Sequence, residues 1–376
     1  MPGISIVIPT MNEEKTIGIC IEKALTVFKG YGVVGEIIVV DNSTDRTAEI
    51  ARSMGAVVIN SVKGYGNAYL AGFSHAKGDY IAMADGDNTY DFLDFPRFLE
   101  PLMNDEADFV IGNRLKNIEK GAMPVLHQYI GNPLLTKVLN FSFKTHISDS
   151  HCGMRAFTRK ALDTMKLKTG GMEFASEMVI EAADRGLRIQ EIPINYYKRE
   201  APSKLRSFED GWRHLRFIML YKPIPFLFIP GLFVFLLGFF LSILILITGE
   251  DVVTTRLHSF ILASFLLIIG GNIISTGVYL KAYSAVHGIS GNNDTFIKRL
   301  LNYHSLEKEI ITGTVLLGIG MFFGIKVILT WMHSGYGSLS EVETAIMAMD
   351  FAAIGILMIF TSILLSILLL DIDKKK

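Results

Sequence analysis

Two aspartates separated by one glycine, Asp85-Gly86-Asp87, are the residues of this sequence best suited to hold a metal ion. They follow a short apolar run, Tyr80–Ala84, which is typical of a buried strand. Two carboxylates at a strand end can reach the same divalent ion, and Gly86 lets a diphosphate approach closely. Mg²⁺ and Mn²⁺ prefer oxygen ligands and often share them with substrate phosphates. The sequence therefore predicts a Mg²⁺ or Mn²⁺ site at Asp85 and Asp87.

An isolated aspartate pair is more often a turn or a helix cap. The neighbouring strands and helices therefore decide whether this pair is a metal site. Strands are expected at Ile4–Ile8, Glu36–Val40, Ala56–Ile59 and Tyr80–Ala84, with helices opening at Asn12 and covering Arg46–Met54 and Gly66–Ala76. This alternation predicts an α/β fold with a mostly parallel sheet. Ligands of such sheets bind at the carboxyl ends of the strands, which here carry Pro9, Asp41 and Asp85.

A glycine-rich stretch, Gly64-Tyr65-Gly66-Asn67-Ala68, has half of a dinucleotide-binding fingerprint. Tyr69 stands where the third glycine belongs, and the stretch follows the third strand instead of the first. A Rossmann dehydrogenase is therefore disfavoured. Two interpretations remain equally open: the start of a helix, or a contact of Gly66 with a donor phosphate.

The second half of the chain has a different composition, with long apolar runs and few charges. Four runs are long enough to cross a bilayer, which takes about 20 helical residues. They are Ile224–Thr248, Leu257–Leu280, Ile310–Trp331 and Ala345–Leu370. The alternative is a large soluble protein with buried helices, which four uninterrupted runs disfavour. The sequence predicts a multi-pass protein of the cell membrane.

The distribution of Lys and Arg predicts the orientation. The two hairpin tips, Gly249–Arg256 and Met332–Thr344, contain Arg256 as their only such residue, whereas Lys281–Glu309 and the tail Lys374–Lys376 are basic. Basic loops stay on the cytoplasmic side. The N-terminal half and the C-terminus should both be cytoplasmic. The first residues lead directly into a strand and lack the pattern of a signal peptide.

An amphipathic helix is expected over Leu205–Leu220, just before the first span. Its apolar face carries Leu205, Phe208, Trp212, Leu215 and Met219. Basic residues and a Trp favour a helix lying in the membrane interface. The alternative is a helix packed on its own domain.

Two charged residues inside the predicted spans, Lys326 and Asp350, should lie at similar depth, about 7 Å inside the membrane boundary. Charges in the hydrocarbon usually find a partner or extend to the interface. We therefore predict that the two side chains pair and hold the third and fourth spans together; independent snorkelling to the interface is the equally open alternative.

Several motifs together resemble the family 2 glycosyltransferases. They are Pro9-Thr10-Met11-Asn12-Glu13, Val39-Val40-Asp41-Asn42-Ser43 and Asp85-Gly86-Asp87. Gly112-Asn113-Arg114 and Ser203-Lys204-Leu205 are similar to motifs of polyprenyl-phosphate hexose synthases such as dolichol-phosphate mannose synthase. The resemblance covers about residues 3–220 and implies a GT-A, Rossmann-like sheet domain. We expect this domain over residues 1–202, an amphipathic interfacial region over 203–222, and an all-α transmembrane domain of four helices over 223–376.

The resemblance also implies roles for individual residues. Pro9, Thr10, Glu13 and Asp41 would hold the nucleoside, and Asp85 and Asp87 the metal and diphosphate. Arg114 would meet the acceptor phosphate, and Ser203 and Lys204 would close over the site. Asp87 and Arg114 are the expected catalytic residues.

Four further positions depart from the pattern or remain secondary. Thr89 stands where mannose synthases carry a Gln that binds the metal. His127 falls where relatives have a second phosphate-binding Arg, although a single His is more often structural. Glu173 and Glu177 share one helix face and are second-tier candidates for a base, which an already ionised phosphate would not need.

The implied reaction is an inverting transfer of a hexose from a nucleotide sugar to a polyprenyl or dolichyl phosphate at the cytoplasmic face. UDP-glucose is preferred as donor, with GDP-mannose next. One alternative, a processive polysaccharide synthase, is disfavoured because its Gln-x-x-Arg-Trp motif is missing. The other is a non-catalytic membrane transporter or scaffold. A net charge of -1 argues against nucleic acid as a partner, and a homo-oligomer remains open.

Overall fold

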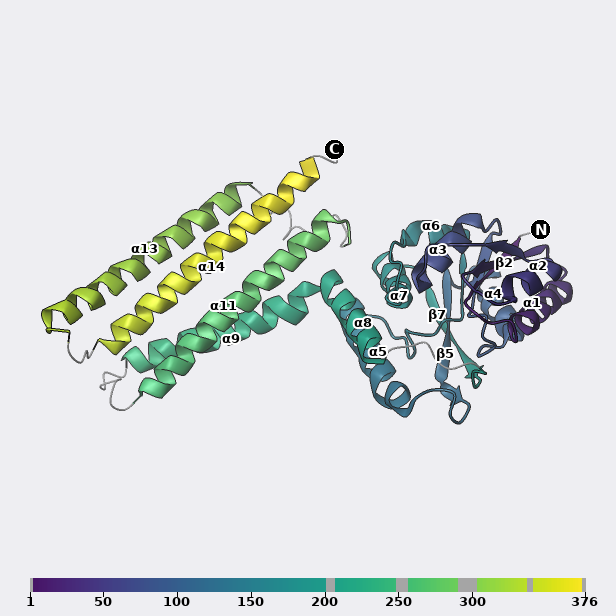
Figure 1. The fold of residues 1–376 in the computed structure, drawn as a ribbon, viewed down its shortest axis with the longest axis horizontal. Coiled ribbons are helices and arrows are strands. Elements are labelled where there is room, and N and C mark those ends of the chain that lie inside the picture. The colour runs from purple at the N-terminus through teal and green to yellow at the C-terminus, as the bar shows by residue number, and fades with distance from the viewer. Residues whose placement is uncertain (1–2, 201–206, 248–255, 290–302, 337–340, 374–376) are drawn as a thin grey trace. The chain divides into compact units, whose positions relative to one another are not determined.

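The structure is a computed structural model that describes residues 3–200, 207–247, 256–289, 303–336 and 341–373. The chain forms two compact units, Met1–Ile218 and Met219–Lys376. The first contains the sheet and the second is helical (Figure 1). The predicted fold class, a mostly parallel sheet domain followed by four long helices, is confirmed.

The first unit is built on a seven-stranded sheet with the order β3-β2-β1-β4-β6-β5-β7. The strands are β1 (Ile4–Thr10), β2 (Gly35–Asp41), β3 (Val57–Ile59), β4 (Tyr80–Met83), β5 (Phe109–Ile118), β6 (Arg155–Thr158) and β7 (Ile189–Tyr196). β1 lies between β2 and β4 and is parallel to both, whereas β6 is antiparallel to its neighbours β4 and β5. The central strands are continuous apolar runs because both faces of the sheet are covered.

Helices cover the sheet and connect its strands. They are α1 (Ile17–Tyr31), α2 (Thr47–Ser53), α3 (Tyr65–His75), α4 (Phe95–Met103), α5 (Asn132–Phe143), α6 (Arg159–Met165), α7 (Phe174–Asp184) and α8 (Ser207–Tyr221), with short turns η1 (Phe92–Asp94) and η2 (His127–Gly131). The helix expected to open at Asn12 begins only at Ile17. Asn12 has a φ of 59°, a left-handed conformation that cannot continue a helix.

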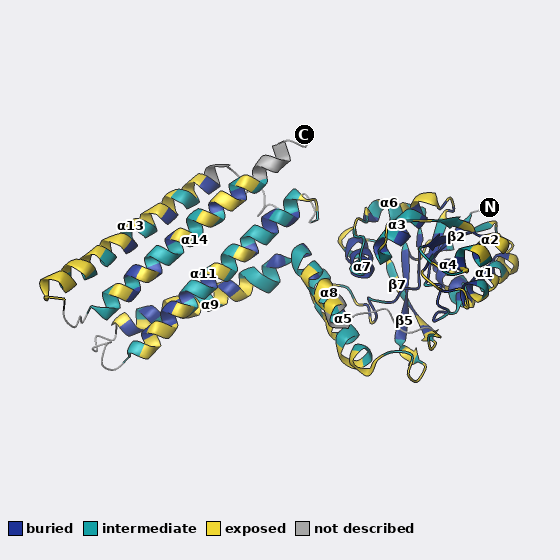
Figure 2. Ribbon diagram, in the orientation of Figure 1, coloured by how far each residue is buried: buried dark blue, intermediate teal, exposed yellow. Residues whose placement is uncertain are grey.

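The second unit contains four helices that are long and apolar enough to cross a membrane. They are α9 (Ile229–Ile247, preceded by η3, Ile224–Phe228), α11 (Leu257–Val286), α13 (Tyr303–His333) and α14 (Val342–Asp373). Large apolar side chains such as Phe233, Phe322 and Phe360 are exposed. Figure 2 shows exposed positions, in yellow, along all four helices. Outward apolar faces are what a helix bundle presents to lipid.

Glycines let these helices approach closely in two pairs. A Cβ on Gly238 of α9 would lie 2.6 Å from the Ala263 carbonyl oxygen of α11. A Cβ on Gly320 of α13 would lie 2.6 Å from the Ala352 nitrogen of α14. Small residues at such crossings are the usual basis of helix packing in membranes.

The predicted pairing of Lys326 with Asp350 is wrong. Lys326 Nζ lies 3.8 Å from Glu341 Oε2 at the beginning of α14, and Asp350 accepts a hydrogen bond from Ser264 of α11. The reason is the direction in which Asp350 projects around the axis of α14. Ala348 and Ala352 face α13, and two residues turn a helix by about 200°, so Asp350 faces away from α13 and toward α11.

Candidate functional site

The carboxyl ends of β1 and β2 bring the first group of predicted residues together. Thr10 is in register with Asp41 and donates a hydrogen bond from Oγ1 to Asp41 Oδ1 at 2.7 Å. Ser43 donates from Oγ to the same oxygen at 2.5 Å and from its backbone N–H to Oδ2 at 3.2 Å. Pro9 lies one residue earlier, opposite Val40. Asp41 is therefore a buried acceptor in a fixed orientation.

The segments after these strands are joined by hydrogen bonds. Asn12 donates its N–H to Ser43 Oγ at 2.7 Å and accepts the N–H of Thr44 on Oδ1 at 2.9 Å. The Glu13 N–H donates to Thr47 Oγ1 at 2.9 Å. The left-handed conformation of Asn12 thus directs Glu13 toward the ends of the strands.

The aspartate pair lies beyond the end of β4, as predicted. Tyr69 donates to Asp85 Oδ1 at 3.1 Å. Thr89 donates to Asp87 Oδ1 from both its N–H, at 3.1 Å, and its hydroxyl, at 2.6 Å. Burial, and then the negative charge of Asp87, raise the pKa of Asp85 to about 6. Burial and the nearby negative charge both disfavour the ionised form of Asp85, and a bound cation would offset both effects.

Thr89 contributes its hydroxyl to Asp87, so its role in the structure is to orient that carboxylate. In the part of the chain that the structure describes, no group of three or more His, Cys, Asp or Glu side chains could hold a metal ion. The protein therefore offers the Asp85 and Asp87 carboxylates, and a hard cation would complete its shell with water and phosphate oxygens. This donor set fits Mg²⁺ or Mn²⁺, which are commonly bound by one or two carboxylates plus substrate phosphates.

Arg199 joins this site and was not among the predicted residues. Its Nη2 lies 2.5 Å from Glu13 Oε1 and its Nε 3.3 Å from Asp87 Oδ2. Burial alone would lower the pKa of Arg199, but the charges of Asp87 and Glu13 outweigh it and the pKa is raised. The signal in the sequence was weak: Arg199 is one of several basic residues in the stretch that leads from the last strand to Lys204.

Arg114 is locked in an ion pair with Asp149, a second residue that sequence reasoning missed. Arg114 donates from Nε to Asp149 Oδ2 at 2.7 Å and from Nη2 to Asp149 Oδ1 at 2.9 Å. It also donates from Nη1 to the Tyr90 hydroxyl at 3.3 Å, and its guanidinium lies over the Tyr196 ring. These bonds use three of the five N–H donors of arginine. The other two have no acceptor among the described residues and could bind a ligand.

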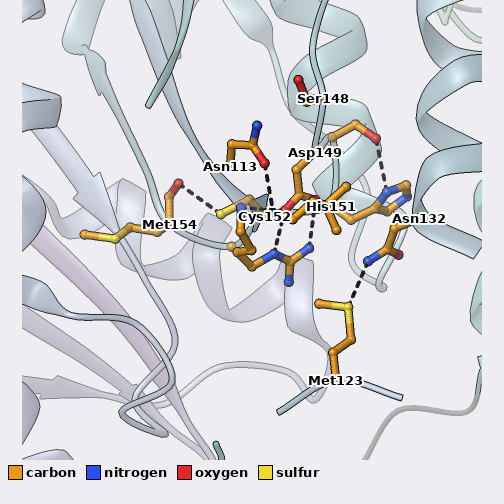
Figure 3. A network of polar contacts seen from close by, with 12 residues as sticks. Asn113, Met123, Asn132, Ser148, Asp149, His151, Cys152 and Met154 are labelled. Carbon is orange, nitrogen blue, oxygen red and sulfur yellow. Dashed lines mark hydrogen bonds and ion pairs between the residues drawn. The ribbon is translucent and has the colours of Figure 1, made fainter. Parts of the chain in front are cut away.

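A further carboxylate holds the backbone at Asp149 in place. Glu191 of β7 accepts the N–H groups of Ser148 and Asp149 on Oε1, at 2.7 and 2.9 Å. Its Oε2 accepts from Asn113 Nδ2 at 3.2 Å. Figure 3 shows Asn113, Ser148 and Asp149 close to one another among the polar contacts of this region. The orientation of Arg114 is thus determined through Asp149 by Glu191.

A buried histidine, His214, and the partly buried His151 connect α8 to the same region. His151 and His214 pack edge to face with ring centroids 4.4 Å apart, and His214 Nδ1 lies 2.8 Å from Ser176 Oγ of α7. Burial, and then the charge of Arg155, lower the pKa of His214 to about 4. α8 therefore packs on its own unit through His214, while Ile218 is buried and Trp212 is exposed.

His127 lies on η2. Burial, and then nearby positive groups that include His127, lower the pKa of His151. The surface around His127 is apolar. Six large apolar side chains of η2, α5 and the turn before them are more than half exposed: Val125, Leu126, Tyr129, Ile130, Leu134 and Phe141. Ser203 and Lys204, the other predicted acceptor-phosphate residues, lie outside the described residues.

Two of the three remaining candidates, Glu177 and Gly66, have structural explanations. Glu177 accepts hydrogen bonds from the N–H groups of Lys168 and Thr169 and from the Thr169 hydroxyl. A Cβ on Gly66 would lie 2.1 Å from the Thr169 carbonyl oxygen, so close packing accounts for this glycine. Glu173 precedes α7, and its Oε2 is buried without a hydrogen-bond partner among the described residues.

Comparison with known proteins identifies relatives of both units. Residues 5–165 match the family described as Glycosyl transferase family 2, and residues 278–369 match the Glycosyltransferase family 2 C-terminal transmembrane region. Low-salt glycan biosynthesis hexosyltransferase Agl6 of Haloferax volcanii is 40% identical over 368 residues, covering 97% of this chain and 88% of that protein. The similarity thus extends across the sheet unit and the helices.

Two other relatives match the sheet unit. Dolichyl-phosphate hexose transferase of Haloferax volcanii is 36% identical over 211 residues, covering 55% of this chain and 89% of that protein. Dolichyl-phosphate beta-glucosyltransferase of Saccharomyces cerevisiae is 28% identical over 225 residues, covering 52% of this chain and 67% of that protein.

Proposed function

The chain belongs to the family 2 glycosyltransferases of the dolichyl-phosphate hexosyltransferase type, and we propose that it transfers a hexose from a nucleotide sugar to a polyprenyl or dolichyl phosphate. The observation that carries the proposal is the position of Asp41 at the carboxyl end of β2 and of Asp85 and Asp87 beyond the carboxyl end of β4, the two strands that flank β1 and run parallel to it. An enzyme needs this arrangement to hold a nucleoside and a diphosphate side by side.

The donor is a nucleotide sugar whose nucleoside lies along Pro9, Thr10 and Asp41. Asp41 accepts from Thr10 and Ser43, and its remaining acceptor capacity suits the hydroxyl groups of a ribose. UDP-glucose is the first candidate and GDP-mannose the second. Glucose is consistent with the name of the yeast relative, whereas the two archaeal names specify only a hexose.

Asp85 and Asp87 would hold a divalent ion against the diphosphate. Mg²⁺ or Mn²⁺ held by these carboxylates would supply positive charge to offset the negative charge that develops on the leaving nucleoside diphosphate. Thr89 and Tyr69 keep the two carboxylates oriented. The protein's contribution is mainly position and electrostatic preorganisation.

An oxygen of the acceptor phosphate attacks the anomeric carbon, and the bond from that carbon to the diphosphate oxygen breaks. Attack in line with the leaving group inverts the anomeric configuration. Arg114 would meet the acceptor phosphate with its two remaining N–H donors, and Ser203, Lys204 and His127 complete the proposed phosphate-binding set. A phosphate is already ionised near neutral pH, so no general base is required, which agrees with the commitment of Glu177 to backbone N–H groups.

The acceptor is a membrane lipid, and the chain is suited to reach it. Exposed apolar side chains of η2 and α5 surround His127, and Trp212 of α8 is also exposed. α8 ends at Tyr221, three residues before the first span begins at Ile224. Amphipathic elements of this kind lie in the membrane interface. The Lys and Arg distribution supports a cytoplasmic catalytic unit and C-terminus.

A donor screen with polyprenyl phosphate tests this function. Purified protein in detergent is given undecaprenyl or dolichyl phosphate with UDP-glucose, UDP-N-acetylglucosamine or GDP-mannose, each with Mg²⁺, with Mn²⁺ or with EDTA. We expect a glycolipid with one donor and no product with EDTA. Product that persists in EDTA would contradict metal dependence. Absence of product with every donor and lipid would contradict the proposed acceptor.

A further inference from the structure

Arg199 lies between two carboxylates that the proposed function assigns to the donor. It contacts Glu13 at 2.5 Å through Nη2 and Asp87 at 3.3 Å through Nε. Both carboxylate side chains are more than nine-tenths buried, and Arg199 is itself mostly covered. A largely buried cation thus stands beside Asp87, one of the two carboxylates that a divalent ion needs.

The contacts of the two Asp87 oxygens show where Arg199 and a metal ion would compete. Its Oδ1 accepts two hydrogen bonds from Thr89, which come from a backbone N–H and a hydroxyl. Its Oδ2 faces Arg199. A metal ion shared with Asp85 must use an oxygen that is not already committed to Thr89, and this is Oδ2. Arg199 and the metal therefore compete for the same atom.

Charge makes simultaneous binding unfavourable in the absence of a substrate. A divalent ion next to a guanidinium is repelled, and the repulsion is strong where water is largely excluded. The diphosphate of a nucleotide adds negative charge at this point and can stabilise both cations together. Without the diphosphate, Arg199 already neutralises much of the charge that the metal would neutralise.

We propose that Arg199 is a built-in counter-ion of the metal site, which keeps the site from binding a divalent ion until a nucleoside diphosphate is present. The proposal rests on the assignment of Asp85 and Asp87 as metal ligands. It specifies an order of binding, in which metal and nucleotide enter together and metal alone binds weakly. The cell's free divalent ions would then not occupy the site in the absence of donor.

The experiment measures Mn²⁺ binding by the loss of the free-ion EPR signal, using the full chain in detergent, with and without UDP or GDP. The variants are R199Q, which removes the charge, and R199K, which keeps a charge but cannot span two carboxylates as a planar fork. The control is R97Q, which removes an arginine of α4 that pairs with Asp94 at 2.9 Å. Folding is checked by thermal melting in the same detergent.

Without nucleotide, R199Q should bind Mn²⁺ at least tenfold more tightly than the wild type and R97Q, with R199K in between. With nucleotide, this difference should shrink. If R199Q binds Mn²⁺ alone no more tightly than the wild type, the counter-ion role is wrong while the metal site stands. If R199Q fails to fold, R199K binding Mn²⁺ no more tightly than the wild type overturns the role. If the wild type binds no Mn²⁺ with either nucleotide, the metal assignment fails and the counter-ion role with it.

Discussion

Glu191 holds Asp149 through the backbone: its Oε1 accepts the Asp149 N–H at 2.9 Å, and the Asp149 carboxylate in turn grips Arg114 on two nitrogens. The guanidinium proposed to meet the acceptor phosphate is thus oriented by a residue on a different strand, which does not touch it. Glu191 and Asp149 together orient the guanidinium of Arg114. Because Asp149 largely balances the charge of Arg114, the main effect of this arrangement is to fix the position of the side chain.

Removing Glu191 should loosen this arrangement. Glu191→Ala frees the N–H groups of Ser148 and Asp149, so we expect the KM for the lipid phosphate to rise about tenfold, the cost of about one hydrogen bond to a charged group. The affinity for nucleotide, measured by calorimetry, should stay within about twofold. Glu191→Gln keeps the Oε1 acceptor and serves as the control. An equal loss of nucleotide affinity in Glu191→Ala would contradict a role confined to the acceptor side.

Arg114 should be sensitive even to a charge-conserving change. Arg114→Lys keeps the cation but cannot make the two-nitrogen contact with Asp149 while also offering N–H groups to a phosphate. We expect a larger loss of turnover with lipid phosphate, about 100-fold, than of nucleotide binding. Steady-state kinetics and nucleotide titration on the same sample measure both. If nucleotide binding falls as much as turnover, Arg114 belongs to the donor site.

Asp87 should be essential for transfer and dispensable for folding. Asp87→Ala removes the oxygen that a metal would use, so transfer should fall by at least about 100-fold in Mg²⁺ or Mn²⁺. Asp94→Ala, which removes an aspartate from an exposed ion pair with Arg97, is the matched control. The melting temperature in detergent shows whether the variant is folded. Near-normal turnover of Asp87→Ala would mean that the metal assignment is wrong.

The buried His214 predicts a pH dependence of stability. Its pKa falls from 6.5 to about 4 on folding, so between these values the unfolded chain binds a proton that the folded chain does not. Above pH 6.5 protonation of this group does not reduce the free energy of unfolding. As the pH falls toward 4, the free energy of unfolding decreases by about 3 kcal/mol on account of this group. Thermal melts from pH 7 to pH 4 should show a shallower loss for His214→Gln than for the wild type. The exposed His75→Gln should follow the wild type, and identical slopes for all three proteins would contradict the assignment.

Two glycines of α13 provide a matched test of helix packing. A side chain on Gly320 would meet Ala352 and the Ala348 carbonyl of α14 within 3 Å, whereas one on Gly324 meets nothing within 4 Å. Gly320→Val should therefore lower stability in detergent by about 1–3 kcal/mol, the typical cost of overpacking. Gly324→Val should be nearly neutral. Similar effects of both variants would mean that α13 and α14 do not pack as described.

The sequence was sufficient for the parts of the site that depend on neighbouring elements. β1, β2 and β4 were predicted from apolar runs, and Asp41 and Asp85 follow from where those runs end. Helices long enough to span a membrane were equally accessible, because length and hydropathy determine them. The aspartate pair could be singled out because it lies at the end of a strand in an alternating series.

The missing residues depend on contacts between segments far apart in the chain. Asp149 reaches Arg114 because antiparallel β6 lies between β4 and β5, and no local pattern predicts that order. Arg199 meets Glu13 across 186 positions of sequence. Lys326 and Asp350 were misjudged because depth in the membrane was considered and rotation about the helix axis was not.

The burial of His214 and Ile218 also defines where the catalytic unit can be separated for study in water. A soluble fragment ending at residue 202 would lose α8 and uncover Ser176 and His151, which both contact His214. A fragment that continues to Tyr221 keeps the contacts of His214 with Ser176 and His151 and ends before the first span. Solubility would then be limited by the exposed apolar residues of η2 and α5, which are the positions to make polar first.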